Sequence, residues 1–183
     1  MQDLLSYLNY SLLFRNFLEV ITGLDNTLLL LVISLPIGFV LSLLFAIGRV
    51  SKNQFISKPI ASYIFVIRGT PLLVQIYLIY FGLGSIEFIR ESFLWYLLRE
   101  PFWCGVLALT INTVAYGSEI FRGGIQSVTK GQIESGLSLG FNKIDLLRKI
   151  IFPIALRKVL PSYGNELILM VKATSLVLSL IHI

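Results

Sequence analysis

The chain has 183 residues, of which 56% are hydrophobic and only 14% are charged. Soluble domains hold about 45–50% apolar and about 25% charged residues, so this composition excludes an ordinary soluble domain and indicates an integral membrane protein. The net charge of +5 does not indicate a nucleic-acid partner, because the basic residues lie in the connections between apolar segments and not on one soluble face.

The first predicted element covers residues 11–22, where apolar side chains recur at helical spacing around Arg15 and Glu19. We predict an amphipathic helix that lies in the membrane interface; a loosely ordered tail is the alternative. Residues 28–47 follow, twenty residues without a charge. At a rise of about 1.5 Å per residue they can cross a hydrocarbon core of about 30 Å, so they form the first predicted span.

The second predicted span, residues 60–83, is interrupted by Arg68-Gly69-Thr70-Pro71. An arginine inside a span costs a few kcal/mol or more unless it is paired or hydrated, so Arg68 is a functional candidate. Gly69 and Pro71 loosen the helix, and the backbone groups that they free are tolerable only within protein or beside a cavity. Gln75 lies one turn further on. The interruption is therefore predicted to be functional.

The third and fourth predicted spans, residues 102–120 and 163–182, also carry polar residues. In the third span these follow the spacing i, i+4, i+7, and in the fourth two of them share a face. They are Asn112, Tyr116 and Glu119 in the third span, and Asn165, Glu166, Lys172, Thr174 and Ser175 in the fourth. Together with residues 68–75 they predict a central pathway or gate for a polar solute. The alternative is a set of structural contacts between helices, for example Glu119 or Glu166 paired with Arg68 or Lys172.

The connection between these two spans, residues 121–153, contains the signals of two short helices. Thr129 and Gln132 fit a capping box at the start of the first helix. Gly140 fits the left-handed position at its end. Asn142 fits the cap of the second helix, which Pro153 would terminate or kink. A mere connector needs no such structure, so this loop is predicted to bind a partner.

The first short helix is predicted to carry Ile133, Leu137 and Leu139 on one side. The small residues Ser135, Gly136 and Ser138 would leave another face flat enough for a partner to approach the backbone. Glu134 is then the expected charged contact. Packing of the loop against its own bundle is the alternative.

Lysine and arginine in the connections predict the orientation. The segments on one side of the membrane, residues 48–59 and 121–162, hold three and seven basic residues. The segments on the other side, those before residue 28 and over 84–101, hold one and two. The N-terminus is therefore predicted outside and the structured loop in the cytoplasm.

No enzyme site is predicted. One cysteine and one histidine cannot form a disulfide framework or a metal cluster, and the chain has no phosphate-binding loop. A transporter without an ATP site must use ion gradients or borrow an ATPase. The structured loop favours borrowing.

A motif in this loop resembles the "EAA" motif, Glu-Ala-Ala-x3-Gly-x9-Ile-x-Leu-Pro, of the membrane subunits of bacterial ABC importers. The chain has Glu134-Ser-Gly, three residues, Gly140, nine residues and Ile150-Ile-Phe-Pro153, with the spacing kept. Ser135 and Gly136 replace the two alanines. Three further stretches, over residues 68–75, 115–127 and 172–176, are similar to signatures of the polar amino acid permeases of the histidine, glutamine and arginine type.

The resemblance implies an all-helical type I importer permease, a single transmembrane domain over residues 1–183 of the bacterial inner membrane. It implies a second permease subunit, identical or different, two cytoplasmic ATPase subunits that bind ATP and magnesium, and a periplasmic or lipid-anchored binding protein. The motif loop would be the coupling helix that docks on the ATPase. The residues that the resemblance assigns to coupling are Glu134, Ser135, Gly136, Leu137, Gly140 and Pro153.

The family pattern has a fifth span, whereas this sequence leaves the pattern at Val177, so a truncated C-terminus is expected. Two alternatives to a polar amino acid importer remain open. One is a gradient-driven carrier or channel that uses Arg68, Glu119 and Lys172 as an ion or proton relay. The other is an importer of the same class for another small polar solute, such as an opine or a sulfur compound.

Overall fold

The computed structural model of the chain describes residues 10–181, and within them it contains helices and no strand, so the all-helical prediction is confirmed. Two π-helical turns, η1 (Leu78–Gly82) and η2 (Leu147–Ile151), join α4 to α5 and α10 to α11. The α-helices are α2 (Tyr10–Val50), α3 (Gln54–Gly69), α4 (Leu72–Tyr77), α5 (Leu83–Ser85), α6 (Glu87–Arg90), α7 (Trp95–Leu98), α8 (Pro101–Gln126), α9 (Lys130–Ser138), α10 (Lys143–Leu146) and α11 (Phe152–Ile181).

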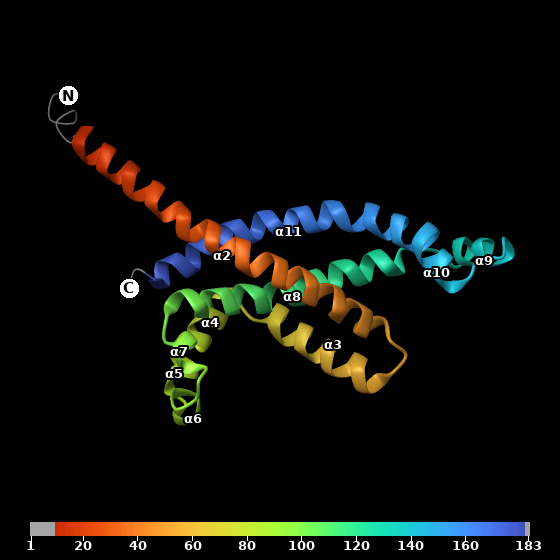
Figure 1. Cartoon of the computed structure of the whole chain (residues 1–183), viewed down its shortest axis with the longest axis horizontal. Coiled ribbons are helices and arrows are strands. Elements are labelled where there is room, and N and C mark those ends of the chain that lie inside the picture. Colours follow the sequence, from red (N-terminus) through yellow and green to blue (C-terminus); the bar gives the residue numbers. More distant parts are fainter. Residues whose placement is uncertain (1–9, 182–183) are drawn as a thin grey trace.

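Three long helices, α2, α8 and α11, form the body of the molecule, and α3 packs against α2 and α8 (Figure 1). The chain runs along α2 to one end, returns along α3, and repeats this course along α8 and α11. The α2–α3 turn and the α9–α10 region therefore share one end, called here the α9 end. The segment from α5 to α7 lies at the other. The two more basic connections thus lie at the same end, in agreement with the predicted topology.

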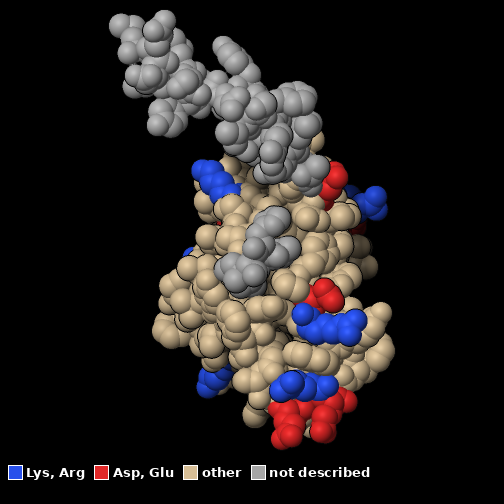
Figure 2. Space-filling view, turned by 90° about the vertical axis from the view of Figure 1, so that its left-hand side faces the viewer, with Lys and Arg blue, Asp and Glu red and all other residues tan. Residues whose placement is uncertain are grey.

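Figure 2 shows the molecule from the side that bears both chain ends, with few charges on a mainly uncharged face. The densest group of acidic and basic side chains stands at the foot of this view, where α6 and α7 lie. The charged residues of this segment, Glu87, Arg90, Glu91, Arg99 and Glu100, are all exposed. A polar connection outside an apolar layer has this distribution of charge.

Two helices within residues 10–181 are long and apolar enough to cross a membrane, Gly23–Val50 in α2 and the whole of α8. A third crossing results if α3 and the segment Leu72–Ser85 count as one broken span. The helix α11 is not among these candidates, so the fourth span stays a prediction.

The segment over residues 11–22 is helical, as predicted, but it is not a separate helix; its place in the membrane interface stays a prediction. It continues into the first span, and the two form the single helix α2. Pro36 lies inside this helix. Gly23 lies between the two parts, but a single glycine inside a helix costs only about 1 kcal/mol and does not end it.

The predicted second span is not one straight helix, because α3 and the α4–α5 segment are inclined at 107° to each other. Thr70 has extended backbone angles, φ −115° and ψ 142°, which is the conformation that a following proline favours. Pro71, the N-cap residue directly before α4, has no N–H to donate. The interruption predicted from the sequence is thus a sharp bend.

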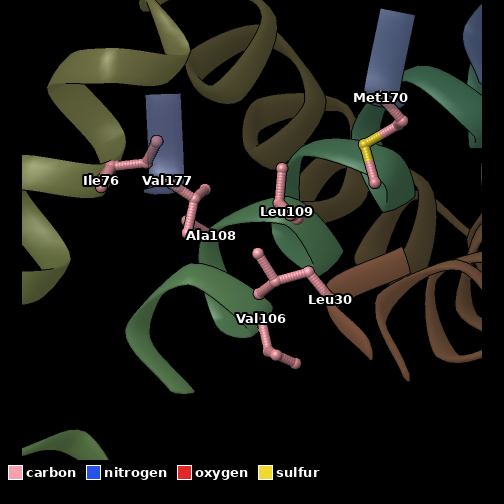
Figure 3. Packing of buried hydrophobic residues seen from close by; sticks show 7 residues of the cluster. All are labelled: Leu30, Ile76, Val106, Ala108, Leu109, Met170 and Val177. Atoms are coloured by element: carbon pink, nitrogen blue, oxygen red, sulfur yellow. The ribbon is translucent and has the colours of Figure 1, made fainter. Parts of the chain in front are cut away.

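The main hydrophobic core lies where α2, α4, α8 and α11 meet, and Figure 3 shows its buried side chains pointing toward one another. Close helix contacts in the bundle depend on small residues. A Cβ built on Gly38 of α2 would lie 2.7 Å from Thr113 Cγ2 of α8. One turn further on, Ser42 Oγ donates a hydrogen bond of 3.0 Å to the Thr113 carbonyl oxygen. The core residues are Leu30, Ile76, Val106, Ala108, Leu109, Met170 and Val177.

Pro153 does not end the second short helix. It lies in the first turn of α11, directly after the π-helical turn η2. A proline in a helix clashes with the carbonyl group four residues earlier and leaves it without a donor, and the wider π-helical turn accommodates this disturbance. The chain is therefore helical without a break from α10 into α11, and the helix that contains the predicted fourth span begins at Phe152.

Candidate functional site

A cavity of about 460 Å³, with charged and polar residues in its lining, lies between the α3–α4 bend, α8 and α11. The bend contributes residues 68–72, α8 contributes two residues one turn apart, and α11 contributes an acidic residue and an apolar wall. We call it the central cavity. Among the residues predicted for the pathway, those that line it are Arg68, Gly69, Thr70, Pro71, Asn112, Tyr116 and Glu166.

The buried side chain of Gln75 holds the bend that forms one wall of this cavity. Its Nε2 donates hydrogen bonds to the Ile67 carbonyl oxygen at 2.7 Å and to Thr70 Oγ1 at 2.8 Å. Its Oε1 accepts a hydrogen bond of 3.3 Å from Asn112 Nδ2. Gln75 thus compensates for the backbone bonds lost at Pro71 and ties the bend to α8, and it does not itself line the cavity.

Two groups of opposite charge face the central cavity. The guanidinium of Arg68 lies over the ring of Tyr116, 5.0 Å from its centre. Glu166 is only 7% exposed, and within residues 10–181 no hydrogen bond or ion pair to its side chain is formed. A buried carboxylate without a partner is costly. The cavity therefore offers an acidic group that a cationic group of a ligand can neutralise.

The other polar residues of α11 lie outside the central cavity. Asn165 and Lys172 share a face, as predicted, but that face is exposed in this chain, as is Ser175. Thr174 is buried, and its hydroxyl donates to the Val171 carbonyl oxygen at 2.6 Å. A role of these four residues in the pathway stays a prediction.

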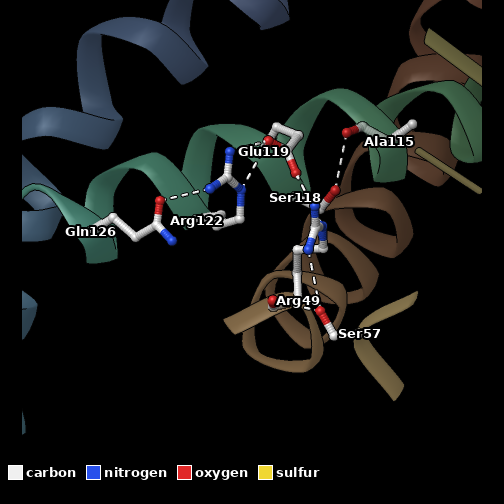
Figure 4. A network of polar contacts seen from close by, with 7 residues as sticks. All are labelled: Arg49, Ser57, Ala115, Ser118, Glu119, Arg122 and Gln126. Carbon is white, nitrogen blue, oxygen red and sulfur yellow. Dashed lines mark hydrogen bonds and ion pairs between the residues drawn. The ribbon is translucent and has the colours of Figure 1, made fainter. Parts of the chain in front are cut away.

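Glu119 lies nearer the α9 end, beside a second cavity of about 400 Å³ that Arg49 and Arg68 also line. Arg122 Nε and Nη2 both donate to Glu119 Oε2, at 2.9 Å and 2.5 Å (Figure 4). Arg49 Nε lies 3.8 Å from Glu119 Oε1. The ionic partners of Glu119 are thus Arg122 and Arg49, and not Arg68 or Lys172 as the structural alternative had proposed.

Sequence reasoning missed Arg49, which counted only as a basic residue of a connection. Its position at the end of the longest uncharged segment is the one signal that could have singled it out. The packing of α2 against α8 brings it to Glu119, and its Nη1 donates to Ser57 Oγ at 3.2 Å. Its Nε is buried and has no hydrogen-bond partner among the described residues.

The second candidate element is the α9 region at the end of the molecule, and its predicted caps are confirmed. Gln132 N–H donates to Thr129 Oγ1 at 3.4 Å, and Thr129 N–H donates to Gln132 Oε1 at 3.0 Å. Gly140 has the left-handed φ of +78°. Asn142 Oδ1 accepts from the backbone N–H groups of the next helix. These local bonds give α9 a defined shape at the tip of the bundle.

The face that α9 turns inward is different from the predicted one. Gly136 is buried, and a Cβ there would lie 2.5 Å from Ile150 Cδ1 and 2.6 Å from Leu146 Cδ1. The prediction that Gly136 belongs to a flat outer face is therefore wrong. Gly136 instead allows α9 to pack closely against α10 and η2. Glu134, Ser135 and Ser138 are exposed, as are Leu137 at 54% and Leu139 at 74%. The outer face is thus partly apolar with one acidic group.

We expect Gly140→Val to loosen the turn after α9. The left-handed conformation costs a residue with a Cβ roughly 1–2 kcal/mol, and a β-branched residue adopts it least well. Hydrogen exchange of residues 130–142 in the purified protein should be faster in the variant. Gly131→Ala is the matched control, because Gly131 lies in the first turn of α9 with open space around it. Unchanged exchange in Gly140→Val would contradict the role of this turn.

Comparisons with known proteins agree with the sequence motif. A family model described as "Binding-protein-dependent transport system inner membrane component" matches residues 16–183. The octopine transport system permease protein OccM of Rhizobium radiobacter is 47% identical over 164 residues, which is 90% of this chain and 67% of that protein. The histidine/lysine/arginine/ornithine transport system permease protein HisM of Escherichia coli is 47% identical over 156 residues, 85% of this chain and 66% of that protein.

The arginine ABC transporter permease protein ArtM of Haemophilus influenzae is 43% identical over 165 residues, 90% of this chain and 72% of that protein. A solved structure described as "Crystal structure of an amino acid ABC transporter with histidines" superposes with a TM-score of 0.77 at 40% identity. The match covers 98% of this chain and 76% of the solved one. The chain thus spans about two thirds to three quarters of the length of these relatives.

Proposed function

Because the chain belongs to the family of binding-protein-dependent transport system inner membrane components, we propose that it is the permease subunit of an ATP-driven ABC importer for polar amino acids. Relatives named for arginine, histidine and octopine transport support this substrate class. A second permease subunit, two cytoplasmic ATPase subunits and a binding protein complete the transporter. ATP and magnesium bind to the ATPase and not to this chain.

The structural feature that supports ATP-driven transport is α9, a capped helix that lies exposed at the end of the bundle. Its outer face combines Glu134 with the exposed apolar side chains of Leu137 and Leu139. A short helix with such a face suits a groove on a partner protein. We infer that α9 docks on the ATPase and that the α9 end faces the cytoplasm, which places the N-terminus outside.

The central cavity is the proposed site of the cargo within the membrane. An amino acid carries a carboxylate and an ammonium group, and the cavity offers Arg68 for the first and Glu166 for the second. Asn112 and Thr70 add uncharged hydrogen-bonding groups beside them. Since Glu166 is buried without a hydrogen-bond or ion-pair partner among residues 10–181, an ammonium group of the cargo would supply the missing charge.

The test is uptake of radiolabelled L-arginine, L-histidine and L-octopine into proteoliposomes that hold the permease with its ATPase and binding protein. We expect Glu166→Gln to lower the maximal rate for the transported compound about tenfold or more, because one charged hydrogen bond contributes roughly 1.5–3 kcal/mol. The control is Glu87→Gln, because Glu87 is exposed on α6, at the end of the molecule opposite the α9 end. Equal rates for both variants would remove Glu166 from the pathway.

The same vesicles separate the ATP-driven from the gradient-driven alternative. Uptake should require both ATP and the ATPase subunit. Uptake that follows an imposed ion or proton gradient in vesicles with the permease alone would instead establish a gradient-driven carrier.

A further inference from the structure

The central cavity and the second cavity meet at the same two residues, Arg68 and Gly69. Arg68 lies over Tyr116; Arg68 lines both spaces and Tyr116 lines the central cavity, so the contact lies at the boundary of the two spaces. On α8 the residues Asn112, Tyr116 and Glu119 share one face in that order, with Asn112 at the central cavity and Glu119 at the second. The second cavity is thus the next space toward the α9 end, beyond a partition made by Arg68 and Tyr116.

The second cavity, like the first, combines a carboxylate with arginine. Glu166 and Arg68 line the central cavity, and Glu119, Arg49 and Arg68 line the second. The exposed side chain of Arg68 lines both spaces, as does Gly69 beside it.

The groups in the second cavity retain free binding capacity. The Arg49 guanidinium forms one hydrogen bond within the described residues, to Ser57, and its 3.8 Å approach to Glu119 is longer than a hydrogen bond. Glu119 Oε2 accepts both bonds from Arg122, whereas the described part of the chain gives Oε1 only the distant Arg49. A carboxylate and an ammonium group could therefore bind between Arg49 and Glu119.

We propose that Arg49 and Glu119 form a second binding station for the zwitterionic head of the amino acid, on the α9 side of the Arg68–Tyr116 partition. The cargo leaves the central cavity when Arg68 moves off Tyr116. Its carboxylate then passes from Arg68 to Arg49, and its ammonium group from Glu166 to Glu119. This inference rests on the proposed transport of amino acids and adds an intermediate position with its two residues.

A purely structural latch between α2 and α8 would act on the amount of assembled complex and not on the transport rate. Arg122 makes the short two-bond contact with Glu119 and also donates to Gln126 at 2.6 Å, all within one helix. It lines neither cavity. If Glu119 only fastened α2 to α8, loss of Arg49, its partner on α2, would lower the amount of assembled complex, whereas Arg122 lies on the same helix as Glu119. The station predicts instead that loss of Arg49 lowers the transport rate per assembled complex.

The experiment measures ATP-driven uptake of L-arginine in the reconstituted complex for Arg49→Gln, Glu119→Gln and Arg122→Gln, with the amount of assembled complex determined for each. We expect the first two to lower the maximal rate about tenfold with little change in KM, and Arg122→Gln to stay within about twofold, since a solvated ion pair on one helix contributes little. Arg49→Lys should restore part of the rate, because it keeps the charge and loses the planar fork.

Three results overturn the inference. They are a rate in Arg49→Gln equal to that of the unmodified protein, a greater loss in Arg122→Gln than in Arg49→Gln, and a fall in assembled complex that accounts for the lost rate. Glu166→Gln, measured in parallel, tests the central cavity alone. If Glu166→Gln is impaired while Arg49→Gln and Glu119→Gln are normal, the proposed function stands and only the second station fails.

Discussion

Replacing Glu134 by lysine is expected to lower ATP-driven uptake about a hundredfold or more, since loss of a buried charged contact between two proteins costs about 2–5 kcal/mol and a reversed charge adds repulsion. Glu134 is exposed on the outer face of α9. Its side chain is used in no bond within the described residues, so the change should leave the fold of the permease intact. The measurement is uptake by proteoliposomes, together with the amount of ATPase that co-purifies with the permease.

The matched control for this prediction is Glu87→Lys. Glu87 is also an exposed glutamate on a short helix, but α6 lies at the opposite end of the molecule (Figure 1). It undergoes the same change of charge and should retain uptake and bound ATPase. Retention of both by Glu134→Lys as well would mean that α9 does not present this carboxylate to the ATPase.

Gly136→Leu is the second change for which we expect a large effect. A Cβ at this position already comes within 2.6 Å of Ile150 and Leu146 side chains, which belong to η2 and α10. A leucine must push α9 away from its support, and overpacking of this kind typically costs about 1–3 kcal/mol. Because α9 would then meet the ATPase in a different orientation, uptake should fall about fiftyfold. A misplacement of about 1 Å can lower the rate at a precisely positioned site by about a hundredfold, so a loss of this size is expected.

Gly131→Leu provides the comparison for this prediction. Both glycines lie in α9, and Gly131 has open space where its Cβ would stand. Leucine has a better helix propensity than glycine, so this variant should keep α9 in place. Limited proteolysis around residues 130–142 should cut Gly136→Leu faster and leave Gly131→Leu unchanged. Equal uptake by the two variants would show that the packing of α9 against α10 has no part in coupling the permease to the ATPase.

The connection between α9 and the cavities runs through continuous helices. The region α10–η2–α11 is helical without interruption from Lys143 and carries Glu166 to the central cavity. On the other side, α8 leads from Glu119 to the start of the α9 region. A displacement of α9 by the ATPase would thus act on both walls, and the π-helical turn η2 is the irregular point of this path. This route is part of the proposed function.

Local structure was the part that the sequence by itself determined. The capping box of Thr129, the left-handed Gly140, the cap at Asn142 and the break at Pro71 all depend on neighbours within about four residues along the chain, and such signals are readable without a fold. The uncharged segment in α2 and the basic connections likewise depend on sequence distance alone. The "EAA" spacing gave the family for the same reason.

Only the tertiary structure decided which way these elements face. Gly136 points inward because η2 and α10 pack over it, Asn165 and Lys172 face away from the cavity, and Arg49 meets Glu119 because α2 and α8 approach closely through Gly38 and Ser42. Periodicity shows which residues of a helix share a face, but the rotation of that face is set by packing against helices that are distant in sequence. Pro153 lies inside a helix although proline tends to end or kink one. The π-helical turn η2 before it and the packed helix α11 after it override this local tendency.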